Sequence, residues 1–128
     1  MATQIRHLSD DILKTLAEYK APLCVTLTMP NIQAGDQQQQ NPIRFKNLIQ
    51  EAEKKLEKLG WDERKIDDFL SEAHDFLDKQ DFSKHRHKSL LVCISADKSE
   101  FIGLPFEVDT HAIVDRHFYL RPVIPHMQ

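Results

Sequence analysis

Residues 90–94, Leu-Leu-Val-Cys-Ile, form the longest uninterrupted apolar run in the chain. A β-strand turns successive side chains to opposite faces, so a strand that is apolar throughout has to be covered on both faces. Residues 23–29 show a second strand pattern, in which Leu, Val and Met alternate with Cys24, Thr26 and Thr28. These two segments predict a sheet with residues 90–94 as a central strand and helices packed on it.

Three segments repeat their apolar residues at the spacing of an α-helix. The first covers residues 9–19, where the Ser9 side chain is expected to accept hydrogen bonds from the first turn. The second begins at Asn41, whose side chain is expected to cap it, and ends at Gly60. The third begins at Asp62, which is a further capping residue. The second and third helices therefore form a hairpin with a very short turn.

Two more strands are expected over residues 101–106 and 111–115, with short polar turns at residues 97–99 and around Asp109. The order of elements is then α-β-α-α-β-β-β. It predicts an α/β (α+β) fold, in which three to four helices pack on a mixed four-stranded sheet. A length of 128 residues fits a single domain with one core.

Composition and charge exclude several classes of protein. The formal net charge of −3 gives no global attraction to nucleic acid or to anionic lipid, so any RNA contact would have to be local. No apolar run approaches the roughly 20 residues of a membrane-spanning helix, and the N-terminus lacks the pattern of a signal peptide. We therefore expect a cytoplasmic protein without membrane contact. Cys24 and Cys93 lie in strand-like runs and are expected to be reduced core residues, with a disulfide as the alternative.

Three phrases of the sequence resemble those of one known family. They are Leu-Thr-Met-Pro at residues 27–30, Gln-Asn-Pro-Ile-Arg-Phe-Lys-Asn-Leu at residues 40–48, and Asp-Arg-His-Phe-Tyr-Leu-Arg-Pro at residues 115–122. Together with the order of elements, they resemble the N-terminal domain of the bacterial relatives of archaeo-eukaryotic peptide-chain release factors and Pelota. The resemblance implies that residues 1–128 are the first domain of a longer protein, in which residues 120–128 begin the linker to a second domain.

In the archaeal and eukaryotic members of this family, the N-terminal domain enters the ribosomal decoding centre. The resemblance therefore implies a non-catalytic domain that contacts the ribosome or a structured RNA during translation termination or ribosome rescue. It places the contact surface on the connector of residues 31–41 and the start of the following helix, at Gln38, Gln39, Asn41, Arg44, Lys46 and Asn47. The family's Asn-Ile-Lys-Ser segment is not intact here, which leaves stop-codon recognition open. A Gly-Gly-Gln tripeptide, which positions water for peptidyl-tRNA hydrolysis in the family, does not occur in the sequence.

Two basic groups are candidates for contact with phosphate. The first would share one face of the second helix, within about 100° of arc, and consists of Arg44, Asn47, Lys54, Lys55 and Lys58. Glu51 lies among these residues, so a solvated face with ion pairs is the alternative. The second group is Lys-His-Arg-His-Lys at residues 84–88.

The same basic cluster raises the question of a metal site. His85 and His87 could share a metal with His74 or His117, but one His-x-His pair supplies fewer than the three or four ligands that a site needs. Contact with phosphate and a plain solvated linker are the other interpretations. We expect neither a metal nor a cofactor.

His111, Asp115, Arg116 and His117 suggest acid–base chemistry. However, no recognisable nucleophile motif or phosphate-binding glycine loop accompanies them, so the chain is not expected to be an enzyme. Asp115 and Arg116 are instead expected to form a turn after the last strand. The alternative to an RNA-binding domain is a protein-interaction or dimerisation module, which would use the same connector or an exposed edge of the sheet.

Overall fold

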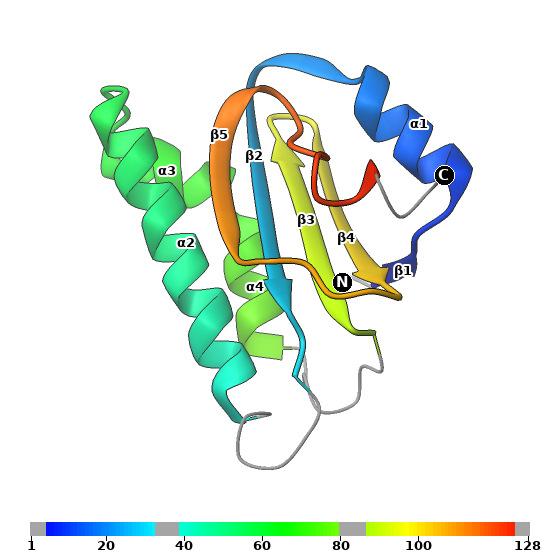
Figure 1. Ribbon diagram of the computed structural model, residues 1–128. Helices are drawn as coiled ribbons and strands as arrows, with labels where there is room; N and C mark the ends of the chain where they lie inside the picture. Colours follow the sequence, from blue (N-terminus) through cyan, green and yellow to red (C-terminus); the bar gives the residue numbers. More distant parts are fainter. Residues whose placement is uncertain (1–4, 33–38, 80–86, 125–128) are drawn as a thin grey trace.

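A computed structural model describes residues 5–32, 39–79 and 87–124 of the chain. In these segments the chain forms four α-helices and five β-strands (Figure 1), which confirms the predicted mixed α/β class. In chain order they are β1 (Arg6–His7), α1 (Asp10–Glu18), β2 (Lys20–Pro30), α2 (Asn41–Lys58), α3 (Glu63–Phe69), α4 (Ser71–Lys79), β3 (Ser89–Ser95), β4 (Lys98–Leu104) and β5 (His111–His117). The sheet has one strand more than expected, because two-residue β1 is too short to produce a sequence pattern.

The five strands form one mixed sheet in the order β1-β4-β3-β2-β5. β1 pairs with β4 in parallel, and all other neighbours are antiparallel. β5 does not pair with β4, which precedes it in the chain, but lies at the far edge beside β2. The segment that crosses from β4 to β5 is held by two hydrogen bonds, from the Val108 N–H to Ser89 Oγ at 2.9 Å and from Thr28 Oγ1 to the Asp109 carbonyl at 2.8 Å.

The sheet lies between two layers, as the apolar run at residues 90–94 predicted. Figure 1 shows α2, α3 and α4 on one face of the sheet and α1 with the C-terminal segment on the other. Every residue of β3 is buried. Its side chains alternate between the two faces, because Val92 packs among the helices α2 to α4 whereas Leu91 and Cys93 pack against the layer of α1.

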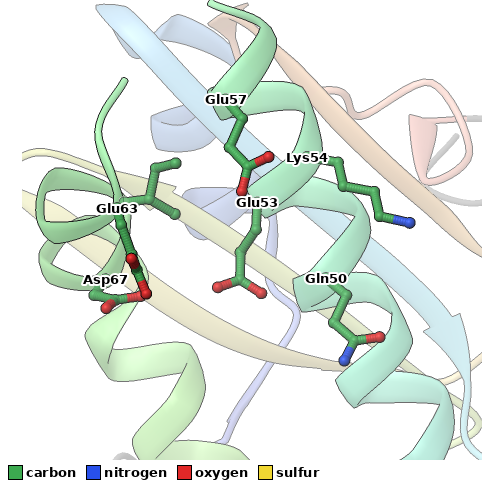
Figure 2. Close-up of a pocket in the computed structure, with 7 residues that line it drawn as sticks. Gln50, Glu53, Lys54, Glu57, Glu63 and Asp67 are labelled. Carbon is green, nitrogen blue, oxygen red and sulfur yellow. The ribbon is translucent and has the colours of Figure 1, made fainter. Parts of the chain in front are cut away.

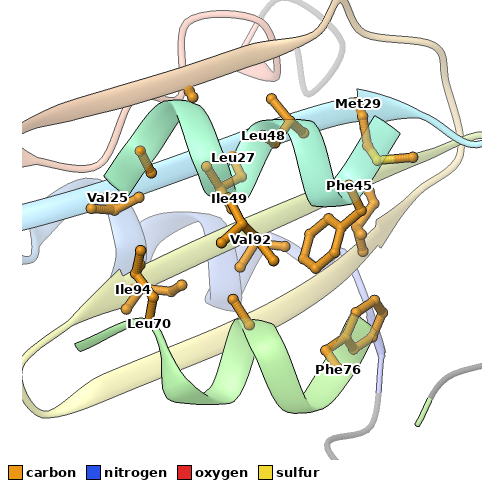
Figure 3. Close-up of a cluster of buried hydrophobic side chains, with 14 of the residues drawn as sticks. Val25, Leu27, Met29, Phe45, Leu48, Ile49, Leu70, Phe76, Val92 and Ile94 are labelled. Atoms are coloured by element: carbon orange, nitrogen blue, oxygen red, sulfur yellow. The ribbon is translucent and has the colours of Figure 1, made fainter. Parts of the chain in front are cut away.

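Three phenylalanines connect the helices to the sheet on the α2 side (Figure 3 labels two of them). Phe76 of α4 lies between the other two, with its ring centroid 5.3 Å from that of Phe45 in α2 and 4.6 Å from that of Phe101 in β4. All three are fully buried. Burial of an aromatic side chain of this size stabilises a fold by about 1.5–3 kcal/mol, so this cluster contributes strongly to holding the helical hairpin on the sheet.

The opposite face is covered by α1, which begins where the sequence predicted. The Ile12 N–H donates to Ser9 Oγ at 3.2 Å, so Ser9 is the expected N-cap. Both cysteines lie in this layer and are free and buried, which confirms that they are reduced core residues. Burial is the main cause that raises the pKa of each thiol, most strongly that of Cys93.

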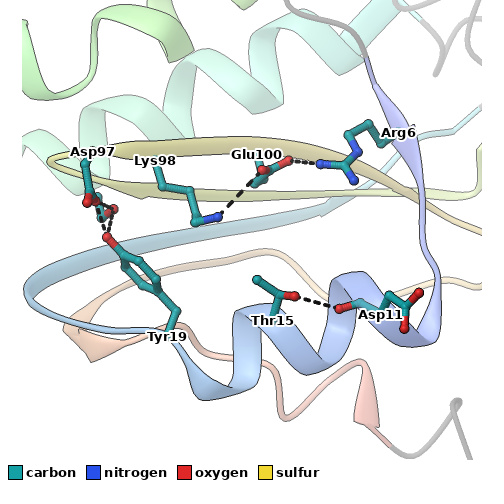
Figure 4. A network of polar contacts seen from close by, with 8 residues as sticks. Arg6, Asp11, Thr15, Tyr19, Asp97, Lys98 and Glu100 are labelled. Atoms are coloured by element: carbon teal, nitrogen blue, oxygen red, sulfur yellow. Dashed lines mark hydrogen bonds and ion pairs between the residues drawn. The ribbon is translucent and has the colours of Figure 1, made fainter.

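Polar contacts join α1 to the β3–β4 hairpin on this face (Figure 4). The Tyr19 hydroxyl bonds with Ser95 Oγ at 2.8 Å and donates to the Asp97 carboxylate. Two residues further along β4 from Lys98, Glu100 forms a 2.8 Å ion pair with Arg6 of β1. The tyrosine bonds therefore attach the end of α1 to the hairpin turn, and the ion pair adds a side-chain contact to the short pairing of β1.

Some predicted boundaries are wrong. The third helix was predicted as a single one, but it is interrupted at Leu70 and forms α3 and α4. Its predicted N-cap is correct, because the Asp62 side chain accepts a hydrogen bond from the Lys65 N–H at 2.8 Å. Apolar residues keep one spacing on both sides of Leu70, so the periodicity does not reveal the break. Gly60 has a φ of +91° and follows the C-cap residue Leu59, so it ends α2 as predicted.

Strand ends were also misplaced. β4 begins at Lys98 rather than at residue 101, and the hairpin turn is made by Ala96 and Asp97. Asp115 and Arg116 are not a turn, because they lie inside β5. Polar residues at these strand ends lack the alternation of apolar and polar positions on which the prediction relied. Within the described residues, no helix combines the length and apolar character needed to cross a bilayer.

Candidate functional site

The two ends of the connector between β2 and α2 are tied together by a buried amide network. Asn41 Nδ2 donates to Asn31 Oδ1 and to the Ile32 carbonyl, each at 2.8 Å. Asn41 Oδ1 accepts from the Ile32 N–H at 3.2 Å and from an Arg44 guanidinium nitrogen at 2.8 Å. One side chain thus holds both the end of β2 and the first turn of α2, and it fixes the position of Arg44.

The network continues from Asn31 to the start of β3. Asn31 donates from its side chain to the His87 carbonyl at 3.0 Å and from its backbone to the Lys88 carbonyl at 2.8 Å. The His87 ring lies edge-on to His7 of β1, with 4.7 Å between the centroids. It also lies where a side chain on Gly103 would be, since a Cβ there would come within 2.1 Å of His87 Cγ. The start of α2 and the start of β3 therefore meet at one end of the sheet.

This network corrects two expectations for Asn41. Its side chain does not cap α2, because the N-cap position is occupied by Gln40, whose side chain makes no capping hydrogen bond. Asn41 is also fully buried, so its side chain is not accessible to a binding partner. The reason is that the backbone of Ile32 needs hydrogen-bond partners where β2 ends, and Asn41 supplies them from inside. Asn41 is therefore a positioning residue at the base of the connector.

The structure separates the other residues that were expected at the contact surface. Gln39 and Asn47 are exposed and Arg44 is half-buried beside Asn41. Gln38 lies outside the described residues. Lys46 does not share a face with Arg44, because two residues correspond to about 200° around a helix, which leaves them about 160° apart. Lys46 instead faces the groove between α2 and α4.

The basic face that the sequence predicted on α2 is present only in part. Arg44, Asn47, Lys54 and Lys58 fall within about 80° around the helix axis, with Glu51 among them. Lys55 is half-buried and does not belong to the accessible face, because its Nζ donates to the Ala112 carbonyl of β5. That bond shows that this flank of α2 lies beside β5. We call the exposed or half-buried residues Arg44, Asn47, Lys54 and Lys58 the basic stripe.

The other flank of α2 borders an acidic hollow of about 450 Å³ against α3. We call it the acidic groove; the residues that line it are Gln50, Glu53, Lys54, Glu57, Glu63, Ile66 and Asp67. Figure 2 shows Glu53 and Glu57 on the α2 wall and Glu63 and Asp67 on the α3 wall, while the Lys54 side chain extends away from them. His74 of α4 lies beside this groove, with its Nε2 3.8 Å from Glu53 Oε2.

Sequence reasoning did not find the acidic groove. It depends on which helical faces meet in the hairpin, and the acidic residues looked like ordinary solvated positions on each helix. The only local sign was that His74 follows Asp67 by seven residues, which would place both on one face of the single helix that the sequence predicted.

Where the structure describes them, the histidines considered for metal binding or acid–base chemistry are not brought together. His111 and His117 stand at opposite ends of β5, roughly 20 Å apart for six residues of strand. His117 lies 3.8 Å from an Asp115 carboxylate oxygen at an exposed position. His87 packs at the other edge of the sheet, and His74 lies in the helical layer. Residues 84–86 of the basic cluster lie outside the described residues.

Comparison with known proteins gives no function for the connector, the basic stripe or the acidic groove. The sequence matches no family model and no curated protein.

Proposed function

We propose that the chain is a non-catalytic binding domain that contacts the ribosome or another structured RNA. In this proposal it is related to the N-terminal domain of bacterial release-factor-like proteins, and it acts in the cytoplasm in translation termination or ribosome rescue. The observation that carries the proposal is the 2.8 Å hydrogen bond that Arg44 donates to the side chain of the buried Asn41. This bond holds Arg44 at the base of the connector, so that the connector and the start of the basic stripe belong to one end of the molecule.

The basic stripe provides a local positive surface on a chain whose net charge is −3. Arg44 and Lys58 are 14 residues apart, which corresponds to about 21 Å along the helix axis. That length is enough to contact several phosphates of one strand, which are about 3.4 Å apart along a nucleic acid helix. Glu51 reduces the positive potential in the middle of the stripe, so we place the main contacts toward its ends.

The test is the salt dependence of binding to purified ribosomes, measured by co-sedimentation. Each of Arg44→Ala and Lys58→Ala should weaken binding and lower the slope of log K against log salt by roughly 0.7–0.9, the value for one lost phosphate contact. Lys14→Ala and Arg121→Ala remove the same charge from exposed positions on the opposite layer and should leave the slope unchanged. Equal slopes for all four variants, or no binding of the wild type, would refute the proposal.

The alternative is a protein-interaction or dimerisation module that uses the edge of the sheet. β5 is an edge strand of the described sheet and could in principle pair with another chain. However, Asp115, Arg116 and His117 are exposed at its end. Charged side chains on an edge strand oppose such pairing. Light scattering over a range of concentrations separates the two functions, because only the alternative requires a stable complex without RNA.

A further inference from the structure

Three side chains from three helices bring possible metal ligands together beside the acidic groove. Glu53 of α2, Asp67 of α3 and His74 of α4 each offer one ligand atom, and these atoms lie within 4.8 Å of one another. Asp67 and His74 are seven residues apart, which is about 10.5 Å along a straight helix. Their ligand atoms are much closer than that, and Glu53 joins them from another helix. The cluster is therefore a property of the helical packing and not of neighbouring sequence positions.

The ligand types select among cations. Magnesium and calcium prefer oxygen ligands alone, whereas an imidazole nitrogen with two carboxylates suits zinc. Zinc binds such ligands at about 2.0–2.2 Å, so the ligand atoms of a tetrahedral site are about 3.3 Å apart. The present separations of up to 4.8 Å can close to this value by side-chain rotation, because none of the three side chains is fully buried. We propose that Glu53, Asp67 and His74 bind one zinc ion, with the fourth position facing solvent in the groove.

The surroundings of the cluster favour a cation in the same place. Glu57 and Glu63 line the groove next to Glu53 and Asp67, so carboxylates face one another across the two helices. A divalent ion between the walls would replace this repulsion with attraction. The zinc site and the basic stripe lie on different flanks of α2. The inference therefore does not depend on the proposed contact with RNA.

Isothermal titration calorimetry of zinc chloride into the full chain tests the proposal. The wild type should bind one zinc ion per chain, and magnesium chloride should bind much more weakly. His74→Gln and Asp67→Asn should each lower the zinc affinity by at least about tenfold, since even the loss of a group that only orients a ligand costs 10–100-fold. Asp68→Asn and Glu72→Gln are the matched controls. They alter exposed neighbours on α3 and α4 and should keep the wild-type affinity.

A second measurement locates the ion without relying on affinity. The imidazole resonances of His74 should shift in the NMR spectrum at one equivalent of zinc, and those of His111 should not. Circular dichroism establishes that each variant is folded, and Glu53→Gln provides a third ligand variant if one of the others unfolds. Absence of stoichiometric binding, unchanged affinity in the ligand variants, or equal binding of magnesium would each overturn the proposal.

Discussion

Replacement of Asn41 by alanine tests the buried network at the base of the connector. Asn41 is fully buried and makes four hydrogen bonds, two as donor and two as acceptor. Each such bond contributes about 0.5–1.5 kcal/mol net, which gives an upper range of about 2–6 kcal/mol for four. Three of the four are only partly buried, so water can replace some of the lost partners. We therefore expect Asn41→Ala to lower the free energy of unfolding by about 2–4 kcal/mol.

Urea denaturation followed by the fluorescence of Trp61, the single tryptophan, measures this change directly. Thermal denaturation should show a fall of about 10 °C in Tm, since 1 kcal/mol corresponds to about 3–5 °C in a chain of this size. Asn47→Ala is the matched control, because Asn47 is exposed on the same helix and its loss should change stability by less than about 0.5 kcal/mol. A loss below about 1 kcal/mol for Asn41→Ala, or equal losses for both variants, would refute the reasoning.

Two further predictions concern the sheet and its hairpin. Gly103→Ala should lower the free energy of unfolding by about 1–3 kcal/mol, because the new Cβ would overlap the His87 ring. Thermal denaturation of the double variant with His87→Ala should show much of that loss removed, and additive losses would contradict the steric explanation. The hydrogen bond from Tyr19 is the main cause that lowers the pKa of Asp97 below its ordinary value. The stability from this bond is therefore present above the ordinary carboxyl pKa and is lost as the pH falls through the lowered one. In an NMR titration, Tyr19→Phe should move the pKa of Asp97 upward, and an unchanged titration would disprove the assignment.

Local signals in the sequence identified much of the fold. Ser9 and Asp62 were correctly recognised as helix caps, because capping depends on one side chain and the backbone of the next turn. The central position of residues 90–94 was also predictable, since a strand that is apolar on both faces has to be covered on both faces. Each of these features is decided by residues within a few positions of one another.

The candidate sites needed the tertiary structure. Asn41 looked like an exposed helix cap. Its hydrogen bonds to Asn31 and Ile32 show instead that it is a buried residue that holds the end of β2 beside the start of α2. Arg44 and Lys46 were expected to act together, but the packing of α2 places one beside Asn41 and the other over the groove toward α4.

By itself, the sequence determined the class of fold, the central strand and the helix caps at Ser9 and Asp62, because short-range periodicity and capping dictate them. Only the tertiary structure decided that β5 lies beside β2 and that Glu53, Asp67 and His74 converge. The physical reason is that long-range pairing depends on the shape and burial of surfaces that meet only after the chain has folded.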